Sequence, residues 1–332
     1  DSTNHHPMHA KKQLQNSMQP TSGFIPLSSF SFSSAIDEVN GDLHLVDFIS
    51  NQLVYSRLVN GTSWESNQTI LYNTTASYVI EGVVFDSSGN LIAVISDRGN
   101  QRISYVFRTL SELYSPPISE INWTYGVIST WHDEVDDIDF TENSFDIQID
   151  SSDRIHCVYS VELAGYDTLN DRDDMDRYLQ YESFELSSTG DLQNTLQKRL
   201  GPDNSQVEMD AGNWGWSPKI ATGANGTAHI IHGSHYSGAI KYTVYDPNTE
   251  ELAHIANLTQ AYMYPNQINM AVMLDSNETV HLVYQTEDTN SGASKLNYRS
   301  YTSEDGTLAI GPTKAWPILN DNMDNTEPTY GP

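Results

Sequence analysis

The sequence has one cysteine, few basic residues and no long hydrophobic run. Cys157 is the only cysteine among 332 residues, so no disulfide can form within the chain. The longest apolar stretches, such as residues 91–95, are strand-sized and fall well short of the roughly 18 apolar residues of a membrane helix. These absences exclude a domain held together by internal disulfides and a membrane-spanning helix within this sequence.

Basic residues are scarce. The chain has 16 Lys and Arg against 44 Asp and Glu, which gives a formal charge of −28. A nucleic-acid ligand requires a basic surface to displace its counterions, so this chain would repel phosphate backbones. Nucleic acid is therefore excluded as a partner, and the acidity is typical of a protein that stays soluble in a salty or calcium-rich medium.

The usual motifs of catalysis are also missing. The sequence has no nucleotide-binding glycine loop, no G-x-S-x-G turn, no HExxH pair and no cysteine-based metal cluster. Motif matching alone therefore names no reaction.

What the sequence does contain is one unit repeated five times. In each copy an apolar strand leads into a turn rich in Asp, Asn and Gly, and a second strand follows. After a variable loop, a third strand ends in Tyr. The turn and second strand occupy residues 38–46, 86–94, 150–158, 223–231 and 275–283, and the third strands end at Tyr55, Tyr105, Tyr181, Tyr242 and Tyr298.

The separations between copies are unequal, which suits blades that keep their strands and vary their loops. Short alternating strands without a helical period favour an all-β fold. We therefore predict a β-propeller of four-stranded antiparallel blades, with five repeats and the approach to a sixth blade near the C-terminus.

This repeat resembles the sialidase-like (BNR-type) propeller repeat over about residues 30–320. The likeness lies in the D-x-x-G turn, the apolar strand and the Tyr-ending third strand. True Asp-boxes of the form Ser-x-Asp-x-Gly-x-Thr-Trp are absent, and residues 303–307 match only in part. There is also no arginine cluster of the kind that binds sialic acid, so a sialidase activity is not implied.

The predicted organisation has three parts. Residues 1–22 form a polar N-terminal tail, residues 23–320 the propeller, and residues 321–332 a connecting segment or the start of a further blade. The chain is then a fragment of a longer protein, or its ends complete a blade together, or they complete one across a subunit boundary. Unpaired strand edges are costly, so one of these arrangements is expected.

Four of the repeats carry a His at the same place in the second strand: His44, His156, His229 and His281. Propeller symmetry separates equivalent positions, so we expect these side chains to pack between blades and not to bind a metal together.

His232 and His235 have no counterpart in the other repeats. They fall at the end of a second strand and in the loop that follows, beside Tyr236. A neutral His and a Tyr can serve as base and acid for β-elimination from a uronic acid, and Arg98 or Arg102 would neutralise the substrate carboxylate. The His-loop-Leu/Ile-x-Tyr pattern is similar to that of ulvan-lyase-type polysaccharide lyases, which implies such an activity. Polar loop residues without a catalytic role are the alternative.

Two further groups of side chains suggest ligands. Trp131, Trp214 and Trp216 are predicted in connections between blades, where tryptophan stacks on sugars or wedges between blades. Two acidic runs offer the oxygen ligands of structural Ca²⁺, although a solvated acidic loop is the alternative. Their candidate ligands are Asp133, Asp136, Asp137, Asp171, Asp173 and Asp174.

Export is indicated by two features. The chain begins with Asp1, which suggests that a signal peptide was removed, and it carries N-glycosylation sequons that all end in Thr. The sequon asparagines are Asn60, Asn67, Asn73, Asn122, Asn225, Asn257 and Asn277.

Two functions remain open. The first is a secreted, glycosylated surface module that binds a glycan, another extracellular protein or copies of itself. The second is a polysaccharide lyase or glycoside hydrolase acting on an acidic polysaccharide at the mouth of the propeller. Fold alone does not decide between them.

Overall fold

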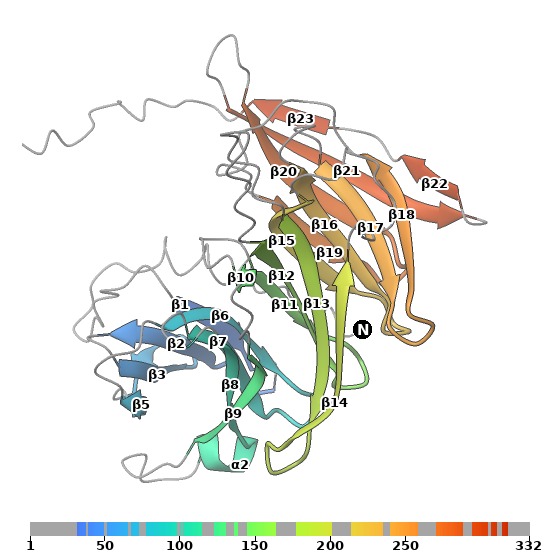
Figure 1. The fold of residues 1–332 in the computed structure, drawn as a ribbon. Coiled ribbons are helices and arrows are strands. Elements are labelled where there is room, and N and C mark those ends of the chain that lie inside the picture. Colours follow the sequence, from blue (N-terminus) through green and yellow to red (C-terminus); the bar gives the residue numbers. More distant parts are fainter. Residues whose placement is uncertain are drawn as a thin grey trace, which may run out of the picture.

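The chain forms five antiparallel β-sheets that follow one another around an arc (Figure 1). The structure is a computed structural model. It describes residues 32–37, 39–49, 52–65, 68–72, 78–97, 100, 102–114, 123–130, 136–138, 145–163, 177–200, 214–234, 240–257, 270–287, 294–304, 307–310 and 314–317.

The first two sheets contain the strands up to residue 130. In the first sheet the strand order is β1-β2-β3-β4, with β5 also paired to β3, and in the second it is β6-β7-β8-β9. The first-sheet strands are β1 (Phe32–Ile36), β2 (Leu43–Ile49), β3 (Gln52–Val59), β4 (Ser63–Trp64) and β5 (Gln68–Tyr72). The second sheet has β6 (Tyr78–Phe85), β7 (Leu91–Asp97), β8 (Arg102–Arg108) and β9 (Thr124–Thr130), with a short helix α2 (Leu110–Leu113) before β9.

The other three sheets repeat this order. The third has β10 (Asp136–Ile138) and β11 (Phe145–Ile149), both paired to β12 (Ile155–Leu163), then β13 (Arg177–Leu186) and β14 (Leu192–Leu200). The fourth has β15 (Trp214–Thr222), β16 (Ala228–Ser234), β17 (Ile240–Asp246) and β18 (Glu251–Asn257). The fifth has β19 (Met270–Leu274), β20 (Val280–Glu287) and β21 (Ser294–Glu304), with β22 (Thr307–Ile310) and β23 (Lys314–Pro317) both paired to β21.

The hydrophobic core is a series of layers between successive sheets. One cluster joins Val46 of the first sheet to Ile80 of the second, and the next joins Ile92 of the second to Phe145 of the third. Two more clusters join the third sheet to the fourth and the fourth to the fifth. Sheets that pack face to face around an arc are the blades of a β-propeller, so the predicted fold class and its five four-stranded repeats are confirmed.

The repeated turn is shaped by its first residue. The Asp86 carboxylate accepts hydrogen bonds from the backbone N–H groups of Ser88 and Asn90, at 3.0 and 2.8 Å. The equivalent residues Asp150 and Asp275 accept the same two backbone bonds in their own turns. An Asp that bonds to its own following backbone fixes a tight turn, which explains why this residue recurs.

The fourth position of the turn has a positive φ and is used to connect blades. Gly89 and Gly226 fill it in two blades, whereas Asp153 and Glu278, with φ of 65° and 58°, fill it in two others. Asp153 accepts hydrogen bonds from the N–H and hydroxyl of Ser87 in the preceding blade, both at 2.6 Å. Glu278 likewise accepts from the N–H of Ala224, at 3.2 Å. These carboxylates join neighbouring turns, and this offsets the strain of a non-glycine residue in the left-handed region.

The repeated His and Tyr of each blade contact one another. His44, His156, His229 and His281 each place Nδ1 within 2.5 to 2.7 Å of the hydroxyl of the third-strand Tyr of the same blade. In the third and fifth blades Nε2 also reaches the first Asp of the turn, at 3.0 and 3.1 Å. His44 also packs edge-on against Phe85 of the next sheet, and His156 is completely buried. The expectation that these histidines pack between blades is confirmed.

The environment of these groups affects their protonation. Burial lowers the pKa of His44 and of His229 to about 4. Burial alone would raise the pKa of Asp150, but hydrogen bonds from His156 and Ser152 outweigh it and hold this pKa well below its ordinary value. Since a carboxylate only accepts, Nε2 of His156 carries the hydrogen, and Nδ1 accepts from the Tyr181 hydroxyl.

Tyr181→Phe tests this network. Removing the hydroxyl leaves the buried Nδ1 of His156 without its donor, so the free energy of unfolding should fall by about 1–3 kcal/mol. Tyr298→Phe is the matched control, because its partner His281 is 24% exposed at the side chain and water can replace the hydroxyl. Its cost should stay below about 1 kcal/mol in urea unfolding. Equal losses in the two variants would show that burial of the pair is unimportant.

Asp153 provides a second test. Asp153→Ala removes the bonds from Ser87 and keeps the strained φ, so it should destabilise by about 1–2 kcal/mol. Asp153→Gly removes the same bonds and relieves the strain, so its loss should be smaller. Urea unfolding of both variants separates the two effects, and a glycine variant at least as stable as the native chain would mean that the bonds contribute no more than the strain costs.

Candidate functional site

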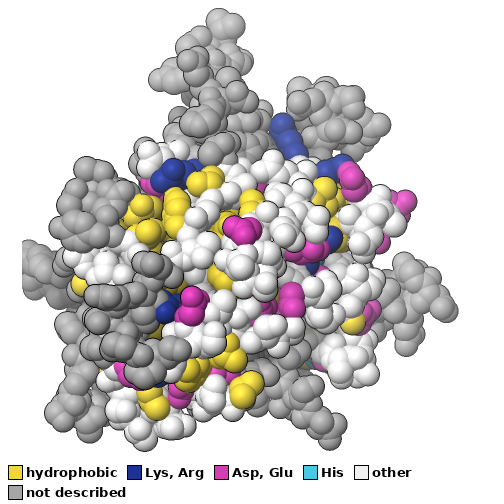
Figure 2. All heavy atoms as spheres, turned by 90° about the horizontal axis from the view of Figure 1, so that it is seen from below, with side chains coloured by type: hydrophobic (Ala, Val, Ile, Leu, Met, Phe, Trp, Pro, Cys, Tyr) yellow, Lys and Arg dark blue, Asp and Glu magenta, His cyan; other side chains and the backbone are white. Residues whose placement is uncertain are grey.

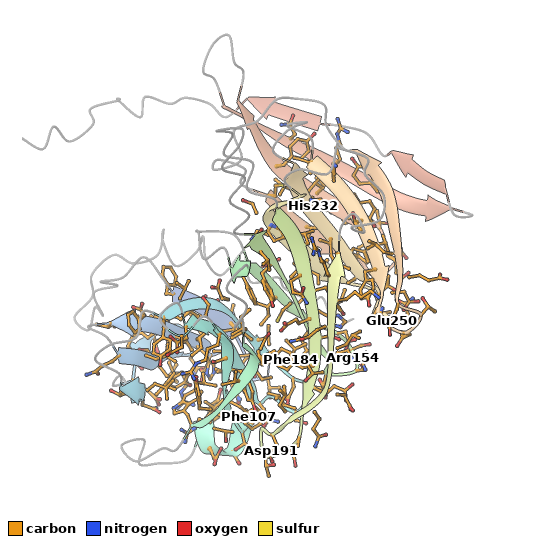
Figure 3. All side chains as sticks on the ribbon, viewed as in Figure 1. Phe107, Arg154, Phe184, Asp191, His232 and Glu250 are labelled. Carbon is orange, nitrogen blue, oxygen red and sulfur yellow. The ribbon has the colours of Figure 1, made fainter. Side chains whose placement is uncertain are left out.

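The sheets have two rims with different connections. The turn rim carries the turns between first and second strands and between third and fourth strands. The loop rim carries the connections between second and third strands, and in the fourth sheet it follows His232. Figure 3 shows His232 near the loop rim of this sheet and Glu250 at the opposite end.

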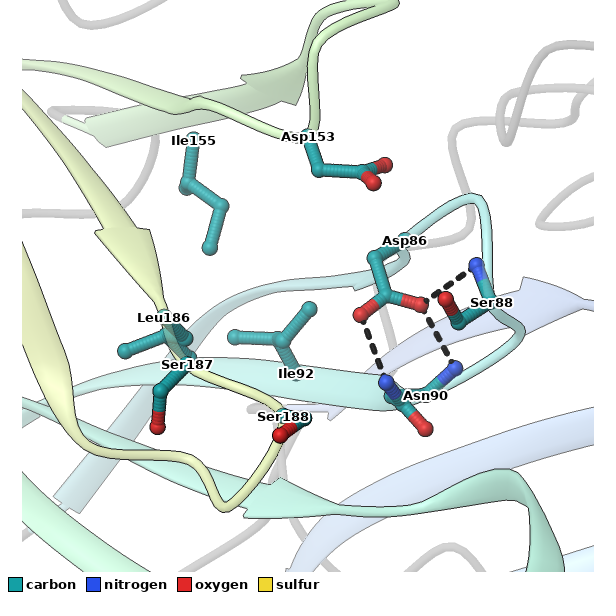
Figure 4. A pocket seen from close by; sticks show the side chains of 9 residues that line it. All are labelled: Asp86, Ser88, Asn90, Ile92, Asp153, Ile155, Leu186, Ser187 and Ser188. Atoms are coloured by element: carbon teal, nitrogen blue, oxygen red, sulfur yellow. Dashed lines mark hydrogen bonds between the residues drawn. The ribbon is translucent and has the colours of Figure 1, made fainter.

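The turn rim contains a hollow between the second and third blades (Figure 4). It has a volume of about 150 Å³, below the 300–1,000 Å³ typical of a ligand pocket. Its carboxylates are already engaged, since Asp86 accepts from Asn90 and Asp153 accepts from Ser87. The remaining lining residues are Ser88, Ile92, Ile155, Leu186, Ser187 and Ser188. This hollow is a structural crevice, not a reaction site.

At the loop rim of the second blade, Asp97 organises the connection that follows it. Its carboxylate is completely buried and accepts hydrogen bonds from the N–H and side-chain amide of Asn100, at 3.2 and 2.7 Å. It also pairs with Arg102, at 3.0 Å to Nε and 2.9 Å to Nη2. The guanidinium of Arg102 lies 5.8 Å from the ring centre of Tyr125. Asp97 thus compensates the charge of Arg102, and a role for Arg102 toward a substrate carboxylate stays a prediction.

At the loop rim of the fourth blade, His232 is completely buried. It lies opposite Lys241 in the ladder between β16 and β17, and its Nδ1 is 3.3 Å from the carbonyl oxygen of Gly233. A general base must reach the proton that it removes. In this arrangement His232 lies beneath the rim, where it supports the strand end that leads to His235.

The remaining candidates are placed as follows. His235, Tyr236 and Arg98 lie outside the described residues, so their geometry is untested and their roles stay predictions. Trp131 also lies outside. Trp214 and Trp216 begin β15, so their predicted position in a connection between blades is wrong. The pairing of β15 with β16 continues through both tryptophans, with register shifts at this end of the strand.

Of the candidate metal ligands, two lie in a strand and the others lie outside the described residues. Asp136 and Asp137 belong to β10 and pair with β12, which corrects the expectation that the whole run is an irregular loop. Asp133, Asp171, Asp173 and Asp174 lie outside the described residues. Within the part of the chain that is described, no three His, Cys, Asp or Glu side chains gather where they could hold a metal ion.

Three of the sequon asparagines occupy exposed turns. Asn60 follows β3, and Asn225 and Asn277 lie in the turns after β15 and β19, so all three are on the turn rim. Asn257 ends β18 at the loop rim, where it pairs with Lys241. Asn67, Asn73 and Asn122 lie outside the described residues, as do the predicted tail 1–22 and segment 321–332.

In Figure 2 acidic and apolar side chains are dispersed among polar ones over the face that is drawn. No described helix is long and apolar enough to cross a membrane.

Two features were not anticipated from the sequence. The hydrogen bond between the repeated His and Tyr joins residues that were noted separately, and their constant place in each repeat was a signal that they meet. The second feature is Glu182, a completely buried acid in the third blade. Nothing in the sequence around Glu182 distinguishes it from a surface residue.

The fold matches solved structures of propeller enzymes. A polysaccharide lyase of family PL25, an ulvan lyase bound to an oligosaccharide, is 12% identical with a TM-score of 0.52, covering 86% of this chain and 70% of its own. A second structure of this lyase family is 13% identical with a TM-score of 0.51 and the same coverage. An intramolecular trans-sialidase from Ruminococcus gnavus is 8% identical with a TM-score of 0.48, covering 87% of this chain and 84% of its own.

The chain shares the propeller fold of the ulvan lyases. The resemblance to ulvan-lyase-type propellers named from the sequence is therefore confirmed at the level of the fold. No protein-family model matches the sequence. No curated protein matches it either.

Proposed function

We propose that this chain is an extracellular carbohydrate-active propeller that cleaves a uronic-acid polysaccharide by β-elimination at its loop rim. The observation that carries the proposal is the fold shared with an ulvan lyase along 86% of the chain. The connections between second and third strands ring one mouth of the propeller, and the one after His232 carries His235, which has no counterpart in the other repeats.

The two rims are suited to different roles, the turn rim to stability and the loop rim to ligand binding. On the turn rim, hydrogen bonds such as those from Ser87 to Asp153 and from Ala224 to Glu278 fix the connections in place. Asn60, Asn225 and Asn277 are exposed there, so N-glycans on them would project away from the loop rim. Export and glycosylation belong to this proposal, and of the described sequons only Asn257 would place a glycan at the loop rim.

The roles of the side chains follow from the chemistry of elimination. A base removes the proton beside the carboxylate, an acid protonates the leaving oxygen, and a cation stabilises the charge on the carboxylate. We assign these roles to His235, Tyr236 and Arg98. His232 is a positioning residue, because it is buried and supports the end of β16.

Activity on uronic-acid polysaccharides tests the assignment. The native chain should generate unsaturated uronic products, followed by the ultraviolet absorbance of the new double bond. His235→Ala should reduce the rate by about 10²-fold or more, as expected for loss of a general base. Tyr298→Phe, which alters a Tyr–His pair of the fifth blade, is the matched control and should keep the rate. Failure of the native chain on every uronic polysaccharide would refute the lyase proposal.

Ionic strength gives a second test. A chain with a formal charge of −28 repels a polyanion, and salt screens this repulsion over a Debye length that falls from about 10 Å at 0.1 M to about 3 Å at 1 M. Raising the salt concentration should therefore lower KM for a charged polysaccharide. A neutral polysaccharide is the control, and a KM that rises with salt would indicate a basic binding site that dominates the net charge.

A non-catalytic binding module is the second candidate. It is favoured by Arg102, whose charge is taken up by Asp97, and by the burial of His232. Such a module would retain a glycan, another extracellular protein or a second copy without cleaving anything, and structural Ca²⁺ at the acidic runs would then serve stability alone. Glycan binding by the native chain, unchanged in His235→Ala and without product formation, would support this candidate over the lyase.

A further inference from the structure

An acidic side chain is buried where the second and third blades meet. Glu182 of β13 is completely buried, and its Oε1 accepts hydrogen bonds from the hydroxyl of Tyr159, at 2.7 Å, and from Nε2 of Gln197, at 3.0 Å. The same Nε2 of Gln197 donates to the Ser129 hydroxyl at 3.0 Å. Because Ser129 belongs to β9 and Gln197 to β14, this network joins the outer strands of the two blades.

The two oxygens of Glu182 differ. Oε1 accepts both hydrogen bonds, whereas Oε2 is buried and makes none. A buried ion without partners on one oxygen is costly, and the cost is much smaller when the carboxyl is neutral or when water reaches it. Gln197 is an exposed residue, so displacing its side chain is the shortest way for water to enter.

No described cation compensates Glu182. On β12 its neighbours are Tyr159 and the buried thiol of Cys157, whose pKa is raised by burial and then by the charges of Glu182, Asp146 and Glu81. Asp146 lies on β11 and accepts from the N–H of Ile220, while Glu81 lies on β6 and accepts from Ser96. On β14, Gln197 is neutral and Arg199 is exposed, and on β9 Ser129 is neutral. Lys219 lies 3.9 Å from Asp146 and is the cation nearest to that carboxylate, whereas the groups that contact Glu182 itself are neutral.

We propose that Glu182 makes the contact between β9 and β14 sensitive to pH near neutrality, keeping it closed when protonated and favouring its opening when ionised. In the closed form the neutral carboxyl needs no water at Oε2. In the open form Gln197 leaves Ser129, and water solvates the carboxylate. The open contact separates the outer strands at one blade boundary and leaves the inner strands packed.

The direction of the pH effect follows from the two states. Burial raises the pKa of Glu182 from 4.5 to about 7 in the closed form, and contact with water restores the lower value in the open form. The stability that protonation gives to the closed contact is fully present below about pH 4.5 and is lost as the pH rises through about 7. From about pH 6 to about pH 8.5 the ratio of open to closed forms should increase about tenfold.

Hydrogen exchange of the backbone amides in β9 and β14 tests the proposal. After correction for the intrinsic pH dependence of exchange, protection in the native chain should fall about tenfold between about pH 6 and about pH 8.5. Glu182→Gln keeps the shape and cannot ionise, so its protection should be independent of pH. Glu185→Gln is the control on the same strand, because Glu185 is partly exposed and pairs with Arg154 at 2.9 Å, and it should behave like the native chain.

A second variant covers the case in which Glu182→Gln does not fold. Gln197→Ala removes the side chain that covers Glu182, so it should admit water at all pH values and abolish the pH dependence while lowering protection overall. The proposal is overturned if Glu182→Gln or Gln197→Ala shows the same tenfold change as the native chain, or if the native chain shows none.

Discussion

The hydrogen bond between a second-strand His and a third-strand Tyr is the interaction on which this fold depends most. It recurs in four of the five blades and lies on the face that each blade turns to the next. A polar pair in such a place is tolerated only when both members are satisfied. In these four blades the pair therefore completes its bond within the blade, whereas in the second blade, which lacks the His, Tyr105 donates to the carbonyl oxygen of Gly190 in the third blade at 2.9 Å.

The turn before each second strand provides further hydrogen bonds at the turn rim. Its first Asp closes the turn and, in the third and fifth blades, also holds the His through Nε2. Its fourth residue connects one blade to another where that residue is Asp153 or Glu278. The carboxylates of the turn rim are engaged in these bonds, and the proposed chemistry is therefore assigned to the loop rim.

Glu182 illustrates how one blade departs from the repeated pattern. In the other blades the residue that follows the third-strand Tyr is not acidic: it is Ser56, Val106, Thr243 or Arg299. An ionisable acid at one boundary gives that boundary a property that the others lack. The repeated strand order fixes which surfaces of the blades meet. Individual residues between two blades then determine how stable that contact is.

The sequence by itself determined the number of repeats, their antiparallel strands and the expectation that the repeated His side chains pack between blades, because period-two alternation and turn residues are local signals. Local signals did not place Trp214 and Trp216, since the extent of β15 depends on its pairing with β16. Nor did they show that Asp97 takes up the charge of Arg102, or that His232 and Glu182 are completely buried. Only the tertiary structure decided these points, because burial and charge pairing depend on which blade packs against which, and that is set by contacts between residues far apart in the chain.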